Sequence, residues 1–155
     1  MALEIEHKFL LKNDEWRSSI SKSIEYKQGY LISDSKRSVR IRISNDQAWL
    51  NIKSATIGTT RQEYEYEIPA SDGIEILNTL CEKPFIEKTR HLVVYKQHTW
   101  EIDVFTGDNE GLTVAEIELS KTGEHFERPP WLDTEVTDQK RYYNNSLCKN
   151  PFKNW

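Results

Sequence analysis

The chain has 155 residues, of which 37% are hydrophobic and 30% charged, a composition typical of one soluble globular domain. Its formal net charge of −4 argues against general binding to nucleic acids through a positive surface. No stretch approaches the roughly 18 apolar residues of a membrane span, and the N-terminus lacks the apolar core of a signal peptide. We therefore expect a cytoplasmic protein with neither a membrane nor a nucleic acid as partner.

Alternation of apolar and polar residues predicts eight β-strands, most of them joined as hairpins. In chain order they cover about residues 2–11, 25–33, 35–44, 49–53, 61–68, 85–95, 98–106 and 112–120. The loop 54–60, which contains Gly58, is either a lid or a plain hairpin connection. No repeat or linker interrupts the pattern, so we expect a single domain that covers residues 1–155.

Local capping signals predict helices before, between and after the strands. Asn13 and the residues that follow it predict a short helix to about residue 22. Ser71 is a favoured N-cap for a second helix to about residue 82, with an apolar stripe of Ile74, Leu77 and Cys81. Thr137 is expected to cap a final helix of about ten residues, and residues 150–155 are expected to be loose. Cys81 and Cys148 lack metal-ligand spacing and are interpreted as two free thiols.

One face of the predicted strands is almost wholly ionised. Its acidic residues are Glu4, Glu6, Glu63, Glu65, Glu101, Asp103, Glu116 and Glu118. Its basic residues are Lys8, Arg40, Arg42, Lys53, Lys88 and Arg90. An antiparallel sheet with one face in water also alternates, but its polar positions more often carry uncharged residues with high β-propensity. Like charges held side by side repel each other, so a merely solvated face does not explain the repeated pairs.

Eight antiparallel strands with an apolar outer face predict a closed barrel of the α+β (mainly β) class, with a few flanking helices. The charged face would then point inward, where each desolvated ion is unfavourable by several kcal/mol unless it is paired. The interior must therefore be wet and hold an ion cluster of complementary charge. A phosphate chain together with Mg²⁺ or Mn²⁺ satisfies both the basic and the acidic residues.

The N-terminal segment shows how one strand could contribute to both a cation site and a phosphate site. In a strand Glu4, Glu6 and Lys8 share one face. Two carboxylates about 6–7 Å apart can converge on one divalent cation, and the lysine can hold an anion beside that cation. His7 faces the other way, into the outer packing or solvent.

The motifs, taken in order, resemble the CYTH superfamily of triphosphate tunnel metalloenzymes, and especially its small bacterial inorganic triphosphatases. The similarity covers nearly the whole chain and begins with the Glu-x-Glu-x-Lys signature, Glu4 to Lys8. The other matching segments are Gln28-Gly29-Tyr30-Leu31, Arg40-x-Arg42, Leu50-x-Ile52-Lys53-Ser54, Arg61-Gln62-Glu63-Tyr64-Glu65, Glu87-Lys88-Thr89-Arg90, Glu101-Ile102-Asp103-Val104-Phe105, Glu116-Ile117-Glu118, Glu135-Val136-Thr137 and Lys140-Arg141-Tyr142 with Asn144.

The resemblance implies an eight-stranded tunnel that binds a triphosphate with a divalent metal and hydrolyses a phosphoanhydride bond. The residues it implies for phosphate binding are Lys8, Arg40, Arg42, Lys53, Lys88 and Arg90, with Lys140 or Arg141 capping the tunnel mouth. The implied metal ligands are Glu4, Glu6 and Glu118, with Glu116 close by. Glu63, Glu65 and Asp103 would line the acidic side, and the catalytic residues would be Glu4 and Glu6, which position the attacking water, with Lys8 beside the substrate.

Our first functional hypothesis is a metal-dependent triphosphatase that acts on inorganic tripolyphosphate, with nucleoside triphosphates as poorer substrates. A thiamine triphosphatase and a class IV adenylate cyclase remain alternatives within the family. A non-catalytic polyphosphate-binding module is an alternative of another class, and it would be expected to lose the metal-binding glutamates, all of which are present here. The oligomeric state does not follow from the sequence, and a dimer is one of the states left open.

Overall fold

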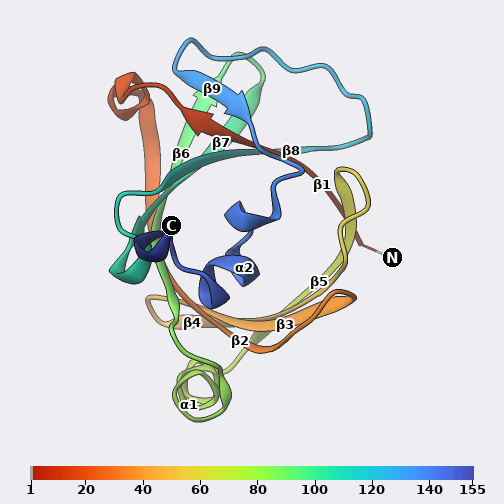
Figure 1. Ribbon diagram of the computed structural model, residues 1–155, viewed down its shortest axis with the longest axis vertical. Helices are drawn as coiled ribbons and strands as arrows, with labels where there is room; N and C mark the ends of the chain where they lie inside the picture. The colour runs from red at the N-terminus through yellow and green to blue at the C-terminus, as the bar shows by residue number, and fades with distance from the viewer. Residues whose placement is uncertain (1) are drawn as a thin grey trace.

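The computed structural model describes residues 2–155, which are mainly β-structure (Figure 1). The strands in this range are β1 (Leu3–Leu11), β2 (Ile20–Ser33), β3 (Arg37–Ser44), β4 (Gln47–Ser54), β5 (Thr60–Ile68), β6 (Ile86–Tyr95), β7 (His98–Thr106), β8 (Thr113–Leu119) and β9 (Leu132–Glu135). The α-helices in this range are α1 (Ala70–Leu80) and α2 (Asn144–Lys149).

The first eight strands close into an antiparallel barrel, in the order β5-β4-β3-β2-β6-β7-β8-β1. Closure depends on β1, which pairs with β8 along Ile5–Phe9 and with β5 along Leu3–Ile5. Figure 1 looks along the barrel and shows these strands as a ring. The predicted eight-stranded barrel is confirmed. The short strand β9 was not predicted, and it pairs with the end of β1.

The outer surface of β1, β6, β7 and β8 carries the largest apolar cluster of the protein. Phe9, Trp100 and Ile117 are buried there. The long connection between β8 and β9 covers them with Phe126 and Trp131, whose rings lie 5.8 Å from the ring of Trp100. The core therefore lies between the outward-facing residues of the barrel wall and the side chains of this connection.

Helix α1 covers the opposite outer face of the barrel, over β3 and β4, and lies outside the ring in Figure 1. Leu77 packs on Ile41, and Gly73 lies directly over Ala48. A Cβ atom added to Gly73 would lie 2.4 Å from the Cβ of Ala48. The helix can therefore sit this close to β4 only because residue 73 has no side chain.

Helix α2 lies within the ring of strands, so the C-terminal segment fills part of the lumen (Figure 1). Leu147 is buried in an apolar cluster with Tyr30 and Phe105, which project inward from β2 and β7. The expectation that residues 150–155 are loose is wrong. This segment is packed, with the ring of Trp155 edge-on against that of Phe152 at a centroid distance of 5.0 Å.

The predicted helix to about residue 22 is wrong. Only Glu15–Ser19 forms a 3₁₀ helix, and β2 already begins at Ile20. From Ile20 onward β2 pairs with β6. The ladder of hydrogen bonds along this pair determines the conformation of a segment whose local sequence favours a helix, a case in which tertiary pairing overrides propensity.

The second predicted helix exists, but its predicted cap and stripe are partly wrong. Pro69 occupies the N-cap position of α1, and Ser71 lies inside the helix without a capping hydrogen bond. Leu77 and Cys81 are buried, whereas Ile74 is 47% exposed. The helix therefore contacts the barrel through a narrower face than the sequence pattern indicated.

The predicted ten-residue helix after Thr137 is also wrong. The hydroxyl of Thr137 instead accepts a hydrogen bond of 3.0 Å from the backbone N–H of Lys8, which docks this residue against β1. The chain then forms a 3₁₀ helix at Lys140–Tyr142 and the six-residue helix α2. Within residues 2–155 no helix is both long and apolar enough to cross a membrane.

The contact between α1 and β4 predicts the effect of Gly73→Ala on stability. Alanine favours a helix by about 1 kcal/mol over glycine, but a Cβ only 2.4 Å from that of Ala48 places overpacking in the upper part of its usual range, about 2–3 kcal/mol. We expect a net loss of roughly 1–2 kcal/mol in the free energy of unfolding, measured by urea denaturation. The matched control is Ser71→Ala, which we expect to stay within about 0.5 kcal/mol of the unsubstituted protein. A Gly73→Ala protein as stable as the unsubstituted one would contradict the contact.

Candidate active site

The inner faces of the strands enclose a cavity of about 230 Å³ whose wall is mainly charged. Every residue predicted to bind phosphate or metal from the strands lines it. These residues are Glu4, Glu6, Lys8, Arg40, Arg42, Lys53, Lys88, Arg90, Glu116 and Glu118. The predicted acids Glu63 and Glu65 line it as well. The alternation of each strand brings these side chains to one face, and barrel closure brings the faces together.

Asp103 on β7 lies behind the cavity wall and is fully buried. Its carboxylate accepts hydrogen bonds from Lys88 Nζ at 2.7 Å and from Nε and Nη2 of Arg90 at 2.8 and 2.9 Å. Burial opposes ionisation of Asp103, but the cations Arg90 and Lys88 outweigh it and lower the pKa of the carboxyl. Asp103 thus fixes the position of two cavity cations.

Glu116 on β8 forms a similar buried group with cations of two other strands. Lys8 Nζ lies 2.6 Å from Glu116 Oε1, and Arg90 Nη2 lies 3.4 Å from Oε2. Although burial acts to raise the pKa of Glu116, Lys8 and Arg90 hold it well below its usual range. Lys8 and Glu116 face each other in the β1–β8 pairing, so the strand register itself creates this ion pair.

Glu4 is held by two cations where β1 meets β5. Arg61 Nη2 lies 2.8 Å from Glu4 Oε1, and Lys53 Nζ lies 3.3 Å from Oε2. Burial would raise the pKa of Glu4, but Lys53 and Arg61 lower it strongly. Arg61 faces Glu4 in the register of the closing pair. Sequence reasoning did not assign Arg61 to the site because the β1–β5 pairing joins strands that are distant in the sequence.

Glu6 and Glu118 face each other across β1 and β8, and within the described residues neither forms an ion pair with a cation. Burial and the negative charges of Glu116 and Glu4 raise the pKa of Glu6 to about 8. Burial and the charges of Glu4 and Glu101 raise the pKa of Glu118 to about 7. This part of the cavity therefore has more carboxyl groups than its own cations can hold in the ionised form.

Arg40 and Arg42 on β3 form the opposite imbalance. Nε of Arg40 donates to Asn51 Oδ1 at 3.2 Å, and Nε of Arg42 donates to Gln28 Oε1 at 2.7 Å. Within the described residues neither guanidinium pairs with a carboxylate. Burial and the neighbouring cations Arg40 and Arg90 lower the pKa of Arg42 to about 10. One wall of the cavity therefore has an excess of positive charge.

The donor set fits a divalent cation near Glu6 and Glu118. Carboxylate oxygens are the ligands that Mg²⁺ uses in proteins, and two opposed carboxylates with raised pKa values are stabilised by a cation between them. Within residues 2–155, no three acidic, histidine or cysteine side chains are close enough to form a complete metal site. Glu4 and Glu116 are engaged by arginine and lysine, whereas Glu6 and Glu118, which face each other, form no ion pair within the described residues and could begin one.

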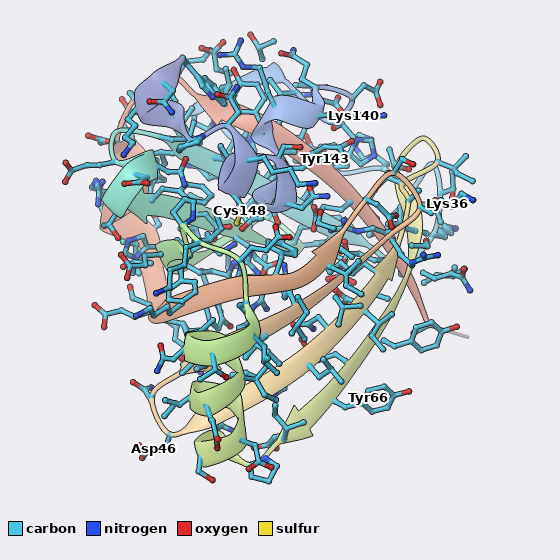
Figure 2. All side chains as sticks on the ribbon, turned by 60° about the horizontal axis from the view of Figure 1, so that its bottom comes forward. Lys36, Asp46, Tyr66, Lys140, Tyr143 and Cys148 are labelled. Carbon is cyan, nitrogen blue, oxygen red and sulfur yellow. The ribbon has the colours of Figure 1, made fainter. Side chains whose placement is uncertain are left out.

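Lys140 and Arg141 do not line the cavity, contrary to the expectation that one of them caps the tunnel mouth. Both are exposed, and Figure 2 shows Lys140 at the surface of the C-terminal segment. The guanidinium of Arg141 lies 3.6 Å from the centre of the Trp155 ring. The segment contributes uncharged residues to the wall instead, among them Tyr143 and Asn144.

Two further observations concern residues with no predicted site role. His7 faces outward, as expected, and its Nδ1 lies 2.7 Å from Glu135 Oε2. Tyr26 and Tyr30 line the cavity, and the Arg42 guanidinium lies 4.4 Å from the centre of the Tyr26 ring. A tyrosine in a strand is typical of packing as well, so no sequence signal distinguishes these two rings from packing residues.

Comparison with known proteins agrees with this arrangement. The sequence profile of the CYTH domain matches residues 2–147. The chain belongs to the CYTH family. An inorganic triphosphatase of Acetivibrio thermocellus is 47% identical over 155 residues, which cover 100% of this chain and 99% of that protein. An inorganic triphosphatase of Nitrosomonas europaea is 32% identical over 149 residues, with 94% and 96% of the two chains covered. The crystal structure of an inorganic triphosphatase superposes with a TM-score of 0.65 at 31% identity, over 96% of this CYTH chain and 95% of the other.

The raised pKa of Glu6 predicts how stability depends on pH in a buffer with a metal chelator. Because its folded-state pKa of about 8 lies above the ordinary glutamate value of 4.5, Glu6 makes folding less favourable as the pH rises between these values. We expect Glu6→Gln, which cannot ionise, to gain stability relative to the unsubstituted protein as the pH increases from 5 to about 8. The free energy of unfolding from urea titrations at several pH values measures this difference.

The control for this prediction is Glu110→Gln, an exposed substitution outside the cavity, for which we expect a pH-independent difference. A Glu6→Gln protein whose stability difference is the same at pH 5 and pH 8 would mean that Glu6 is already ionised at the lower pH in the folded protein.

Proposed function

We propose that this chain is a metal-dependent inorganic triphosphatase, which hydrolyses tripolyphosphate to pyrophosphate and orthophosphate. The observation that carries the proposal is the separation of charge within one cavity, with uncompensated arginines on β3 and uncompensated glutamates on β1 and β8. A phosphate chain bound together with a divalent cation would neutralise both. The full-length similarity to two proteins named as inorganic triphosphatases supports the same activity.

In this proposal the cavity cations bind the phosphate chain. The binding residues are Lys8, Arg40, Arg42, Lys53, Lys88 and Arg90. Arg40 and Arg42 would make the first contacts, because their charges are not neutralised by carboxylates. Lys88 and Arg90 are held in place by Asp103, so little ordering is needed when phosphate binds.

Mg²⁺ or Mn²⁺ would be held by Glu6 and Glu118, with Glu4 and Glu116 joining when phosphate draws their cationic partners away. When bound, the ion would supply charge neutralisation at phosphate oxygens and activation of water. Glu4 and Glu6 would orient the attacking water. Its oxygen forms a bond to the terminal phosphorus, while the bond from that phosphorus to the bridging oxygen breaks and pyrophosphate leaves.

The composition of the cavity wall supports an inorganic substrate over a nucleotide. Of the described lining residues the aromatic ones are Tyr26, Tyr30 and Tyr143. The ring of Tyr26 is covered by Arg42, and Tyr30 belongs to the apolar cluster around Leu147. A base would therefore find little free ring surface on which to stack.

We further propose that residues 1–155 act as one domain in the cytoplasm. Both cysteines, Cys81 and Cys148, are free thiols, which agrees with a reducing compartment.

A substrate panel tests the proposed activity. With Mg²⁺ or Mn²⁺ present, we expect kcat/KM for tripolyphosphate to exceed that for ATP and for thiamine triphosphate by at least about tenfold, because only the phosphate chain has matching contacts. Phosphate release and cyclic nucleotide formation are measured in the same samples. A chelator should abolish turnover.

Glu6→Gln provides the control for contaminating phosphatases. This variant should lose at least about 100-fold in kcat, while tripolyphosphate still raises its melting temperature through the intact cations. Equal rates on ATP and tripolyphosphate, or formation of cyclic AMP, would contradict the substrate. Undiminished turnover by Glu6→Gln would contradict the proposed metal site.

A further inference from the structure

The first residue of α2, Asn144, makes the innermost polar contacts of the C-terminal segment. Its side-chain oxygen Oδ1 accepts a hydrogen bond from Lys88 Nζ at 2.9 Å and another from Gln28 Nε2 at 3.2 Å. Lys88 is 3% exposed and Gln28 is fully buried. Asn144 therefore serves as the shared acceptor for two buried groups on neighbouring strands, β6 and β2.

The orientation of both amide groups follows from the chemistry of their partners. Arginine and lysine side chains can only donate hydrogen bonds. Because Arg42 Nε donates to Gln28 at 2.7 Å, the oxygen of Gln28 must face Arg42 and its NH₂ group must face Asn144. Lys88 independently requires the oxygen of Asn144. The two requirements agree, so one continuous chain of hydrogen bonds runs from Arg42 through Gln28 and Asn144 to Lys88.

The chain continues from Lys88 to Asp103, and Asp103 holds Arg90. Asn144 is thus the point at which the C-terminal segment joins cations of two strands, Arg42 on β3 through Gln28 and Lys88 on β6 directly. The position of Asn144 itself is fixed by residues that precede and follow it in the sequence. Tyr143 donates its hydroxyl to the backbone oxygen of Thr137 at 2.7 Å, and Leu147 is buried in the lumen.

We propose that Asn144 is a positioning residue for phosphate binding, which holds the Lys88 ammonium, and through Gln28 the Arg42 guanidinium, directed toward the cavity. The inference rests on the proposed triphosphatase function for the identity of the ligand. Without the Asn144 oxygen, Lys88 would keep Asp103 as its nearest partner and be drawn back toward β7, away from the cavity. Gln28 would lose the acceptor for its NH₂ group, and its hold on Arg42 would weaken.

A neutral acceptor suits this place better than a carboxylate would. Lys88 already pairs with Asp103 at 2.7 Å. A second carboxylate would neutralise the positive charge that the phosphate needs, whereas an amide oxygen directs the ammonium and leaves its charge available. This explains how an uncharged residue from the C-terminal segment can act in a site whose other groups are mainly ionised.

A double-mutant cycle tests the proposal. The variants are Asn144→Ala, Lys88→Met and the combination of both, measured by the Kd for tripolyphosphate in a calorimeter without divalent metal and by kcat/KM with it. We expect Asn144→Ala to weaken binding about tenfold or more, since it removes a hydrogen bond to a charged group. In the Lys88→Met background the same substitution should change Kd by less than about threefold. The effect should lie mainly in KM, with kcat changed less.

Asn150→Ala is the matched control, because this exposed asparagine directly follows the last residue of α2 and does not line the cavity. Melting temperatures establish that each variant is folded, and Asn144→Ser replaces Asn144→Ala if alanine prevents folding. Binding by the Asn144 variant that equals that of the unsubstituted protein would overturn the proposal. An equal loss with and without Lys88 would also overturn it, since it would mean that residue 144 does not act by positioning the Lys88 ammonium.

The cycle also separates this inference from the proposed function. An unsubstituted protein that binds tripolyphosphate but releases no phosphate would contradict the triphosphatase assignment, while the Kd values would still decide the role of Asn144. A protein that does not bind tripolyphosphate at all would contradict both.

Discussion

The structure depends on how a closed barrel balances charges that its strand alternation forces inside. Three successive inward positions of β1 carry the ionisable residues Glu4, Glu6 and Lys8, and the register of β1 with β8 decides which partner Glu6 and Lys8 meet. Lys8 meets Glu116 and forms an ion pair, whereas Glu6 meets Glu118 and has no cation opposite it. A buried carboxylate without a counter-ion is unfavourable, so this register creates a site where a bound cation would stabilise the fold as well as serve a reaction.

The outer packing and the inserted C-terminal segment make this arrangement possible. The β8–β9 connection and α1 cover apolar faces on opposite sides of the barrel, which lets the inner face be polar without exposing a core. Helix α2 fills part of the lumen with apolar contacts and confines the charged groups to a cavity of about 230 Å³. The outside of the barrel therefore supplies most of the hydrophobic stability, and the inside is left for recognition.

The side-chain view in Figure 2 illustrates the same division. Tyr66 on β5 projects away from the barrel wall, while its strand neighbours Glu63 and Glu65 line the cavity. Tyr143, from the C-terminal segment, also lines the cavity. The lining thus combines charged residues from strands with uncharged residues from the C-terminal segment. Asn144 connects the two groups, because its side-chain oxygen accepts a hydrogen bond from Lys88.

Much of the fold was predictable because strict alternation over many strands has few explanations. The charged face, from Glu4 to Glu118, could be assembled from the sequence because each strand shows its own period of two. Arg61 could not be placed in the site, because its role depends on the long-range pairing of β5 with β1. The C-terminal segment was predicted least well. Its 3₁₀ helices and the short strand β9 have no clear period, and contacts such as that of Thr137 with the Lys8 backbone are long-range.

Crystals grown with Mn²⁺ and the non-hydrolysable analogue imidotriphosphate would test most directly whether the charge imbalance marks a substrate and metal site. Anomalous scattering locates Mn²⁺ independently of the phosphate density. We expect a manganese peak within ligand distance, about 2.0–2.3 Å, of carboxylate oxygens of Glu6 and Glu118, with the phosphate chain on the side of Arg40 and Arg42. A cavity without manganese, or manganese bound only at surface carboxylates outside the barrel, would contradict this account.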